Sequence, residues 1–297
     1  MRIAITGITG LVGTALSQHL QEQSTEVLRL VRQAAQPTDV LWDIENGVSQ
    51  PAQLEGCDAI VHLAGENVAD GRWSEAKKER IRSSRIAGTK NLCRSLAQLE
   101  KPPQVLVSAS AIGFYGDRGE EVLTEESAPG QGFFPQVCQE WEAATQAASD
   151  KGIRVAHLRI GVVLSSSGGA LAKMLPPFKL GLGGRLGSGE QYMSWIALED
   201  LVSAIIHAIN HESLSGPVNA TSPNPAKNAD FTGKLGAVLN RPTLFPVPSF
   251  ALRLAFGEMA DEALLAGARV MPTRLLASGF SFRFPDLEAT LRHCLQD

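Results

Sequence analysis

The sequence predicts an α/β fold in which helices cover both faces of a doubly wound parallel sheet. Through the first two-thirds of the chain, short apolar runs alternate with amphipathic helical patterns. A strand, a glycine-rich turn and a helix follow one another from the first residues, and no internal repeat interrupts the pattern. This alternation favours parallel strands, because each helix carries the chain back across the sheet before the next strand begins.

Hydrophobic periodicity locates the individual elements. Apolar runs predict strands at residues 2–5, 27–31, 59–64, 105–107 and 154–164. Helical spacing predicts helices directly after residue 10 and at residues 80–100, 140–151 and 198–209, with Gly152 ending the third of these. The last third is richer in glycine and proline, although residues 280–284 resemble a strand. We therefore expect a sheet domain at residues 1–220, in which residues 170–195 reach the substrate cleft, and a small lobe at residues 221–297.

Composition excludes several classes of partner. The chain has 297 residues, of which 44% are hydrophobic, and its net charge is −4, so we expect no nucleic acid and no anionic membrane surface. No apolar run is long enough for a membrane span, and the first strand begins too early for a signal peptide. The four cysteines are widely spaced and give no metal-binding pattern. These features predict a cytoplasmic monomer or homodimer that takes a small-molecule substrate and holds no metal.

A glycine-rich turn after the first strand indicates dinucleotide binding. Gly7 permits the tight turn, Gly10 lets the backbone approach a pyrophosphate, and Gly13 allows the helix to pack closely on the strand. The free N–H groups and the positive end of the helix dipole then attract the anion. The alternative is a tight turn without a ligand. The residues expected to bind the cofactor here are Gly7, Thr9, Gly10, Leu11, Val12 and Gly13.

The end of the second strand favours NADP(H) over NAD(H). NAD-binding folds usually place an acid there for the ribose 2′-hydroxyl, but this strand is followed by Arg32, with no acid nearby. A guanidinium suits the 2′-phosphate of NADP. The alternative is an arginine that simply faces solvent.

The glycine spacing, G-x-x-G-x-x-G, resembles that of the short-chain dehydrogenase/reductase superfamily and its extended, epimerase-like branch. The likeness extends over essentially the whole chain and is nearest to the epimerase-family proteins of bacteria and mitochondria. Residues that match the branch are His62-Leu-Ala-Gly65, Ala87-Gly-Thr89, Leu92, Ser108-Ala-Ser110 and Tyr115-Gly116. Those that match the narrower group are Gly65-Glu-Asn67, Trp141-Glu142, Gly183-Gly184, Gly187-Ser-Gly189, Ser194-Trp-Ile196, Pro272 and Gly279-Phe280.

The resemblance implies further cofactor contacts. Asp43, followed by Ile44, matches an adenine-binding pair, although a turn aspartate that caps residues 45–47 is the alternative. Arg85 stands where sugar epimerases carry a cofactor-contacting asparagine, and an arginine could also reach a phosphate. The backbone of Leu63, Ala64 and Gly65, at one strand end, should lie under the cofactor. Ser108 belongs to the serine-rich end of another strand, and Val162 and Val163 stand where the family lines the nicotinamide.

The resemblance to the superfamily implies catalysis by a serine, a tyrosine and a lysine, and this chain departs from that set. Ser110 fits the serine position. Counting back from Glu142, the tyrosine position falls on Phe134 and the lysine position on Cys138. Phenylalanine has no proton to transfer, and a cysteine cannot bind a ribose as an ammonium group does. The substitute acids or bases by position are Tyr115, Glu66, Asp117 and Tyr192, each with packing as the alternative role.

Residues 181–189 form a glycine-rich segment that we expect to be a loop or hairpin at the cleft, with Arg185 and Gln191 as substrate contacts. Residues 246–248 and 251–256 would provide an apolar wall for the pocket or a dimer surface.

Three functions stay open. The chain is either an NADP-dependent reductase or epimerase acting on a sugar nucleotide or small carbonyl, or a catalytically silent NADP(H)-binding redox sensor or scaffold. Loss of the dinucleotide role is the third, and the intact glycine turn favours it least.

Overall fold

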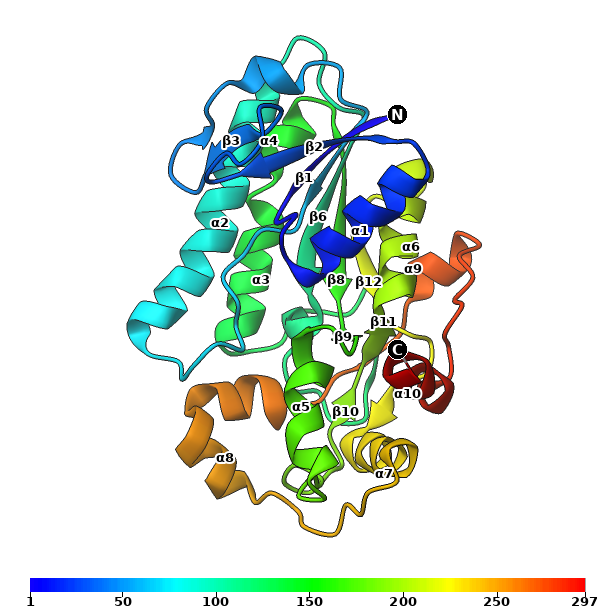
Figure 1. The fold of residues 1–297 in the computed structure, drawn as a ribbon. Coiled ribbons are helices and arrows are strands. Elements are labelled where there is room, and N and C mark those ends of the chain that lie inside the picture. Colours follow the sequence, from blue (N-terminus) through cyan, green and yellow to red (C-terminus); the bar gives the residue numbers. More distant parts are fainter. Residues whose placement is uncertain (297) are drawn as a thin grey trace.

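The computed structural model describes residues 1–296 and is built on an eight-stranded sheet (Figure 1). The strand order is β12-β8-β6-β5-β1-β2-β3-β4, and every pairing is parallel except that of β3 with β4. The chain thus runs outward from β1 in both directions, as in a doubly wound sheet. The strands are β1 (Arg2–Thr6), β2 (Glu26–Val31), β3 (Val40–Asp43), β4 (Gly47–Val48), β5 (Ala59–His62), β6 (Val105–Ala111), β8 (Arg154–Ile160) and β12 (Gly216–Ala220).

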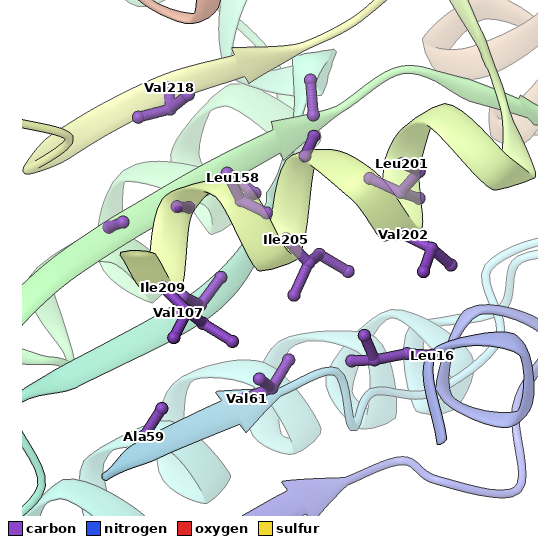
Figure 2. Packing of buried hydrophobic residues seen from close by; sticks show 14 of the residues in the cluster. Leu16, Ala59, Val61, Val107, Leu158, Leu201, Val202, Ile205, Ile209 and Val218 are labelled. Carbon is purple, nitrogen blue, oxygen red and sulfur yellow. The ribbon is translucent and has the colours of Figure 1, made fainter. Parts of the chain in front are cut away.

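Helices cover both faces of this sheet. Helices α1 (Leu11–Glu22) and α6 (Leu198–Asn210) pack on one face, where their leucines and isoleucines meet alternate residues of the strands (Figure 2). Helices α2 (Glu75–Ala97) and α4 (Gln146–Asp150) contribute to the core on the other face. Ile3 belongs to the first core and its neighbour Ala4 to the second, as the period-two alternation of a strand requires.

Two predicted elements are divided in the structure. The helix expected at residues 140–151 is α3 (Phe133–Ala143) followed by α4, and Gly152 ends it with a φ of +86°. The strand expected at residues 154–164 breaks at Gly161 into β8 and β9 (Val162–Leu164). A Cβ atom at Gly161 would lie 2.6 Å from the Ser194 carbonyl oxygen, so the chain turns there to pair β9 with β11 (Trp195–Ala197).

The strand expected at residues 280–284 is wrong. This segment has no regular structure, because the backbone N–H groups of Arg283 and Phe284 donate to the two carboxylate oxygens of Asp200. The phenylalanines at 280 and 282 instead stack edge to face.

A smaller lobe lies beyond one end of the sheet (Figure 1). Its core joins α5 (Gly169–Lys179), α7 (Asn228–Leu239) and α10 (Leu287–Gln296). Strand β10 (Tyr192–Met193) pairs with β13 (Ala226–Lys227), and β14 (Arg269–Val270) pairs with β7 (Val122–Leu123). The remaining elements are the 3-10 helices η1 (Pro51–Leu54) and η2 (Ile112–Tyr115), helices α8 (Ser249–Phe256) and α9 (Thr273–Ala277), and the π-helical turn η3 (Ala260–Leu264).

The glycine-rich segment at residues 181–189 is a loop and forms no hairpin. It runs parallel to residues 245–247, with a bridge between Leu186 and Val247. A Cβ atom at Gly184 would lie 1.7 Å from the Phe245 carbonyl oxygen, so the two segments meet backbone to backbone. Glycine is required at position 184 because the backbones of the two segments approach so closely.

Candidate functional site

The turn between β1 and α1 depends on two of its three glycines for steric reasons. Gly7 has a φ of +68°, and a Cβ atom there would lie 2.8 Å from the Ala64 backbone nitrogen. A Cβ atom at Gly13 would lie 2.3 Å from the Gly7 carbonyl oxygen. Side chains at either position would force α1 away from the sheet, as the sequence analysis anticipated for the first and third glycines.

The N-terminus of α1 is open. Its N-cap is Gly10, which has no side chain to cap the helix, and the first turn contains no acidic residue. Within the described part of the chain, the N–H groups of Leu11, Val12 and Gly13 have no hydrogen-bond acceptor. Unpaired N–H groups at the positive end of a helix dipole form an anion site, so this turn fits the pyrophosphate of a dinucleotide.

A buried hydrogen-bond network lies beneath this turn. Thr6 Oγ1 lies 2.7 Å from His62 Nδ1 and accepts from the backbone N–H groups of Leu63 and Ala64. His62 Nε2 lies 2.9 Å from Thr89 Oγ1. Burial lowers the pKa of His62 to about 4, so the ring is neutral at physiological pH. The network fixes the backbone of Leu63 and Ala64 at the carboxyl edge of the sheet.

The acidic and basic residues near the second and third strands differ in their engagement. Arg32 directly follows β2, is exposed, and forms no ion pair with any described residue, whereas Arg29 lies 3.1 Å from Asp39. Asp43 Oδ1 accepts from the backbone N–H groups of Glu45 and Asn46 at 2.8 and 2.7 Å. These bonds, that from Asn46 above all, lower the pKa of Asp43. The structure therefore gives Asp43 the turn-capping contacts, whereas Arg32 has no ion-pair partner among the described residues.

Arg85 supports the loop after β5. Its Nη1 donates to the carbonyl oxygens of Glu66 and Ile81 at 3.1 and 3.2 Å, and its guanidinium lies over the Trp141 ring. The same group would be 3.4 Å from a Cβ atom at Gly65. Through Nη1, Arg85 thus holds the backbone of the loop after β5.

A chain of polar side chains begins at Ser110, at the end of β6. The Ser110 hydroxyl donates to Glu142 Oε1 at 2.7 Å, and Arg159 binds both Glu142 oxygens at 2.8 and 2.9 Å. Burial alone would lower the pKa of Arg159, but its bonds to Glu142 outweigh that effect and raise it. The serine is 3% exposed, and the side chains of the ion pair are 4% and 12% exposed. Ser110 is therefore coupled directly to a fixed carboxylate.

Tyr115 belongs to the core. It is fully buried, and its hydroxyl lies 2.7 Å from Asn219 Oδ1 and 3.0 Å from the Thr124 carbonyl oxygen. It also accepts from Arg159 Nη1 at 3.0 Å, and burial raises its pKa. All of these contacts are internal, which speaks against the acid/base role that the sequence suggested for Tyr115 and supports its alternative role in packing.

The positions of the usual tyrosine and lysine carry no proton-transfer group. The Phe134 ring packs edge to face on Trp73, with centroids 4.9 Å apart, and its Cβ would lie 3.2 Å from a Cβ atom at Gly113. Cys138 is 2% exposed, and burial raises the pKa of its thiol to about 12. An apolar layer thus occupies this part of the site.

The N-terminus of α3 is closed by the chain itself. The backbone N–H groups of Phe133 and Phe134 donate to the two carboxylate oxygens of Glu262, each at 3.2 Å. The N-cap is Gly132, and a Cβ atom there would lie 2.6 Å from Glu262 Oε1. No local pattern could predict this contact, because Glu262 in η3 lies about 130 residues beyond α3 in the chain.

The other acid/base candidates, Glu66, Asp117 and Tyr192, each make contacts with other residues of the chain. Lys77 donates to Glu66 at 2.7 Å, which lowers the pKa of Glu66 and keeps it ionised. Asp117 Oδ1 accepts from the Gly267 backbone at 3.1 Å, and the Tyr192 ring lies beneath the Arg269 guanidinium. Ser108 is buried, and Val162 and Val163 are half-buried in β9.

A hollow of about 530 Å³ in the small lobe includes one of the expected substrate contacts. Gln191 lies in its wall, and its amide donates to the carbonyl oxygens of Leu186 and Leu264. The nearby carboxylates of Glu120 and Glu190 both pair with Lys227 at 2.8 Å. Its polar walls are therefore largely satisfied by internal bonds.

Comparison with known proteins agrees with this architecture. Residues 3–220 match the model of the NAD dependent epimerase/dehydratase family, and residues 247–294 match a domain of unknown function, DUF1731. An epimerase family protein of Mycobacterium bovis is 47% identical over 281 residues, which are 94% of this chain and 93% of that protein. The human epimerase family protein SDR39U1 is 37% identical over 295 residues, covering 98% and 99% of the two chains.

Two solved structures extend the comparison to three dimensions. Human SDR39U1 (isoform 2), crystallised with NADPH, aligns over 100% of both chains with a TM-score of 0.92 and 35% identity. A nucleoside-diphosphate sugar epimerase from Corynebacterium glutamicum aligns with a TM-score of 0.82 and 41% identity, covering 99% of this chain and 58% of that one. Together with the glycine turn and the sheet order, these matches show that the chain belongs to the NAD-dependent epimerase/dehydratase family.

Proposed function

We propose that this chain binds NADP(H) and acts as an oxidoreductase or epimerase on a hydroxyl or carbonyl carbon of a small substrate, such as a sugar nucleotide. The observation that carries the first part is the open N-terminus of α1, where Gly10 leaves three N–H groups unpaired. The guanidinium of Arg32, which pairs with no carboxylate in the described part of the chain, supports NADP(H) over NAD(H), as does the NADPH in the human relative. Bound NADP(H) would supply or accept the hydride.

The proton would pass through Ser110. In the oxidation direction, the substrate hydroxyl gives its proton to Ser110 Oγ while the Ser110 proton moves to Glu142 Oε1, 2.7 Å away. Arg159 holds the carboxylate in place through two bonds, so Glu142 cannot turn away from the serine. The reverse sequence returns the proton to the substrate. Ser110 is thereby the catalytic residue and Glu142 the group that takes up the proton.

A catalytically silent NADP(H) sensor or scaffold is the second candidate. Phe134 and Cys138 favour it, because an apolar layer stands where the family's acid/base would be. The two candidates share the cofactor and differ only in turnover.

Titration with NADPH and NADH, followed by NADPH consumption with a panel of sugar nucleotides and small carbonyls, tests the proposal. We expect tighter binding of NADPH, and turnover that falls about 100-fold in Ser110→Ala and in Glu142→Gln. Ser149→Ala, exposed on α4, is the matched control and should keep full activity. Tight NADPH binding with no turnover on any substrate would favour the sensor. Equal weak binding of both dinucleotides would overturn the NADP(H) assignment.

A gain-of-function variant separates the candidates further. Phe134→Tyr with Cys138→Lys restores the dyad of the superfamily. Turnover gained by this double variant alone would show that the wild-type site binds the cofactor but lacks the acid/base.

A further inference from the structure

One end of the small lobe exposes an unusual number of large apolar side chains. Seven of the eleven strongly exposed large hydrophobic residues of the described chain lie in two short stretches, residues 180–182 and 244–256. Six of them are between 61% and 77% exposed, and we refer to these six as the apolar tip: Leu180, Leu182, Leu244, Phe245, Phe250 and Leu254. The surface of a monomeric protein rarely exposes so many large apolar side chains close together unless they bind a partner.

The segments that carry the apolar tip are joined to one another through the backbone. Its two loops run side by side, because Val247 donates to the Arg185 carbonyl oxygen at 2.8 Å and Gly187 donates to the Val247 carbonyl oxygen at 2.9 Å. Helix α8 follows directly, and Phe250 and Leu254 are four residues apart on one side of it. In Figure 1 these segments form the end of the molecule farthest from the N-terminus.

The segments that form the tip carry cations and no carboxylate, and Arg253 of α8 is paired with Asp261 just beyond them. Residues 151–189 and 231–257 contain no aspartate or glutamate, although the whole chain has 31 acidic residues. Lys179, Arg185 and Arg241 are exposed beside the apolar side chains and form no ion pair with any described residue. Arg241 Nε donates to the Lys179 carbonyl oxygen at 2.8 Å, which places these two cations together. The tip is therefore apolar in its centre and cationic at its rim.

We infer that the apolar tip docks on an anionic lipid surface. Exposed leucine and phenylalanine side chains enter the boundary between headgroups and acyl chains, while lysine and arginine meet the lipid phosphates. No described helix is long and apolar enough to cross a bilayer, so the attachment is peripheral. The net charge of −4 pointed away from membranes, but charges more than about 8 Å from the surface are screened, and those of the tip decide the attraction.

A second copy of the chain is a poorer occupant. In a symmetric dimer the same patch faces itself, so the cationic rims of the two tips would be brought together. Like charges across an interface oppose association. An anionic surface satisfies both the apolar centre and the cationic rim.

Vesicle flotation with the full chain tests this inference. We expect the wild type to float with vesicles of phosphatidylcholine mixed with phosphatidylglycerol, and to remain unbound with phosphatidylcholine alone. Phe250→Ser with Leu254→Ser should reduce binding at least about tenfold, as should Lys179→Glu with Arg241→Glu. The matched control is Val122→Ser, an exposed apolar residue outside the tip, which should bind as the wild type does.

NADPH affinity and the thermal unfolding midpoint are measured for every variant, so that lost flotation is compared only among folded proteins. Failure of the folded wild type to float with anionic vesicles would overturn the inference. So would equal binding to both vesicle types, or a concentration-dependent dimer that Phe250→Ser with Leu254→Ser abolishes, since that result would assign the tip to a second copy.

Discussion

Two helices of this molecule, α1 and α3, follow a glycine N-cap but differ in whether their first N–H groups are hydrogen-bonded. Helix α1 begins after Gly10 with its first N–H groups unpaired and no acid in its first turn. Helix α3 begins after Gly132, and its N–H groups are taken by the carboxylate of Glu262 from the small lobe. Both ends carry the same partial positive charge. The difference shows that an anion site requires a helix end that the protein itself leaves unsatisfied.

The comparison explains why cofactor binding and proton transfer separate in this chain. The open end retains the features of a dinucleotide site. The closed end is the start of α3, which carries the positions of the usual dyad. There Phe134 has no ionisable group, and burial keeps the Cys138 thiol protonated. A connected acid/base pair is formed instead by Ser110, at the end of β6, and Glu142, one helical turn beyond Cys138 in α3.

Closing the open end should have the largest effect. Gly10→Asp would place a carboxylate at the N-cap of α1, where it would occupy the free N–H groups and repel a phosphate. Loss of two charge-assisted hydrogen bonds predicts about 100-fold weaker NADPH binding, measured by fluorescence titration. The backbone at Gly10 is extended, so the protein should unfold at or above the wild-type temperature. Gly10→Ala adds only the Cβ atom and measures the steric part of the loss, so the further loss in Gly10→Asp is the effect of the carboxylate. An affinity in Gly10→Asp no lower than that of Gly10→Ala would refute the comparison.

Removing the Arg32 charge, which we place opposite the 2′-phosphate, should weaken the binding of NADPH but not that of NADH. Arg32→Ala is expected to weaken NADPH binding about tenfold or somewhat more, because one charge-assisted contact is lost. NADH binding should not change, since NADH has no 2′-phosphate. A parallel loss for both dinucleotides would remove Arg32 from the site.

The buried His62 beneath the β1–α1 turn should make the stability of the protein depend on pH. His62 has a folded pKa of about 4, below its unfolded value near 6.5, so the unfolded chain binds the extra proton between these values. Stability should therefore be full above about pH 6.5 and fall by up to about 1.4 kcal/mol per unit as the pH drops toward 4. Urea unfolding across this window measures the slope. His62→Gln should flatten it, and an unaltered slope would mean that other groups dominate.

Opening the closed end should have the smallest effect. Glu262→Ala removes the cap of α3 and is expected to cost about 1 kcal/mol in the free energy of unfolding, with NADPH affinity unchanged. Its neighbour Asp261, exposed and paired with Arg253, is the matched control, and Asp261→Ala should cost less than about 0.5 kcal/mol. If Glu262→Ala weakened NADPH binding, the two helix ends would not be independent.

Local patterns predicted most of the fold, and the predicted cofactor-binding residues stay a prediction. The turn at Gly7 follows from chain geometry within a few residues, and the strands follow from alternation, so both could be read from adjacent residues. The segment at residues 280–284 has the same local alternation, but Asp200 takes its N–H groups from a distance of about 80 residues. The distant partner outweighed the local preference.

The candidate catalytic residues show the same limit. Ser110 could be placed by its position at a strand end, but its bond to Glu142, and the bond of Glu142 to Arg159, depend on three elements meeting. Tyr115 was a candidate by position until its burial and its contact with Asn219 were known. Arg159, a charged residue in the interior of β8, was a local sign of this network.

The sequence by itself determined that this chain forms a doubly wound sheet with a glycine turn at a helix N-terminus, and that Phe134 and Cys138 replace the usual dyad. These properties depend on residue type and near-neighbour spacing. Tertiary structure alone decided which helix end stays open, which carboxylate the serine meets and which apolar side chains remain uncovered. Each of these depends on what a distant segment leaves unpaired, because a polar group or apolar surface acts on a ligand only when the fold has not already satisfied it.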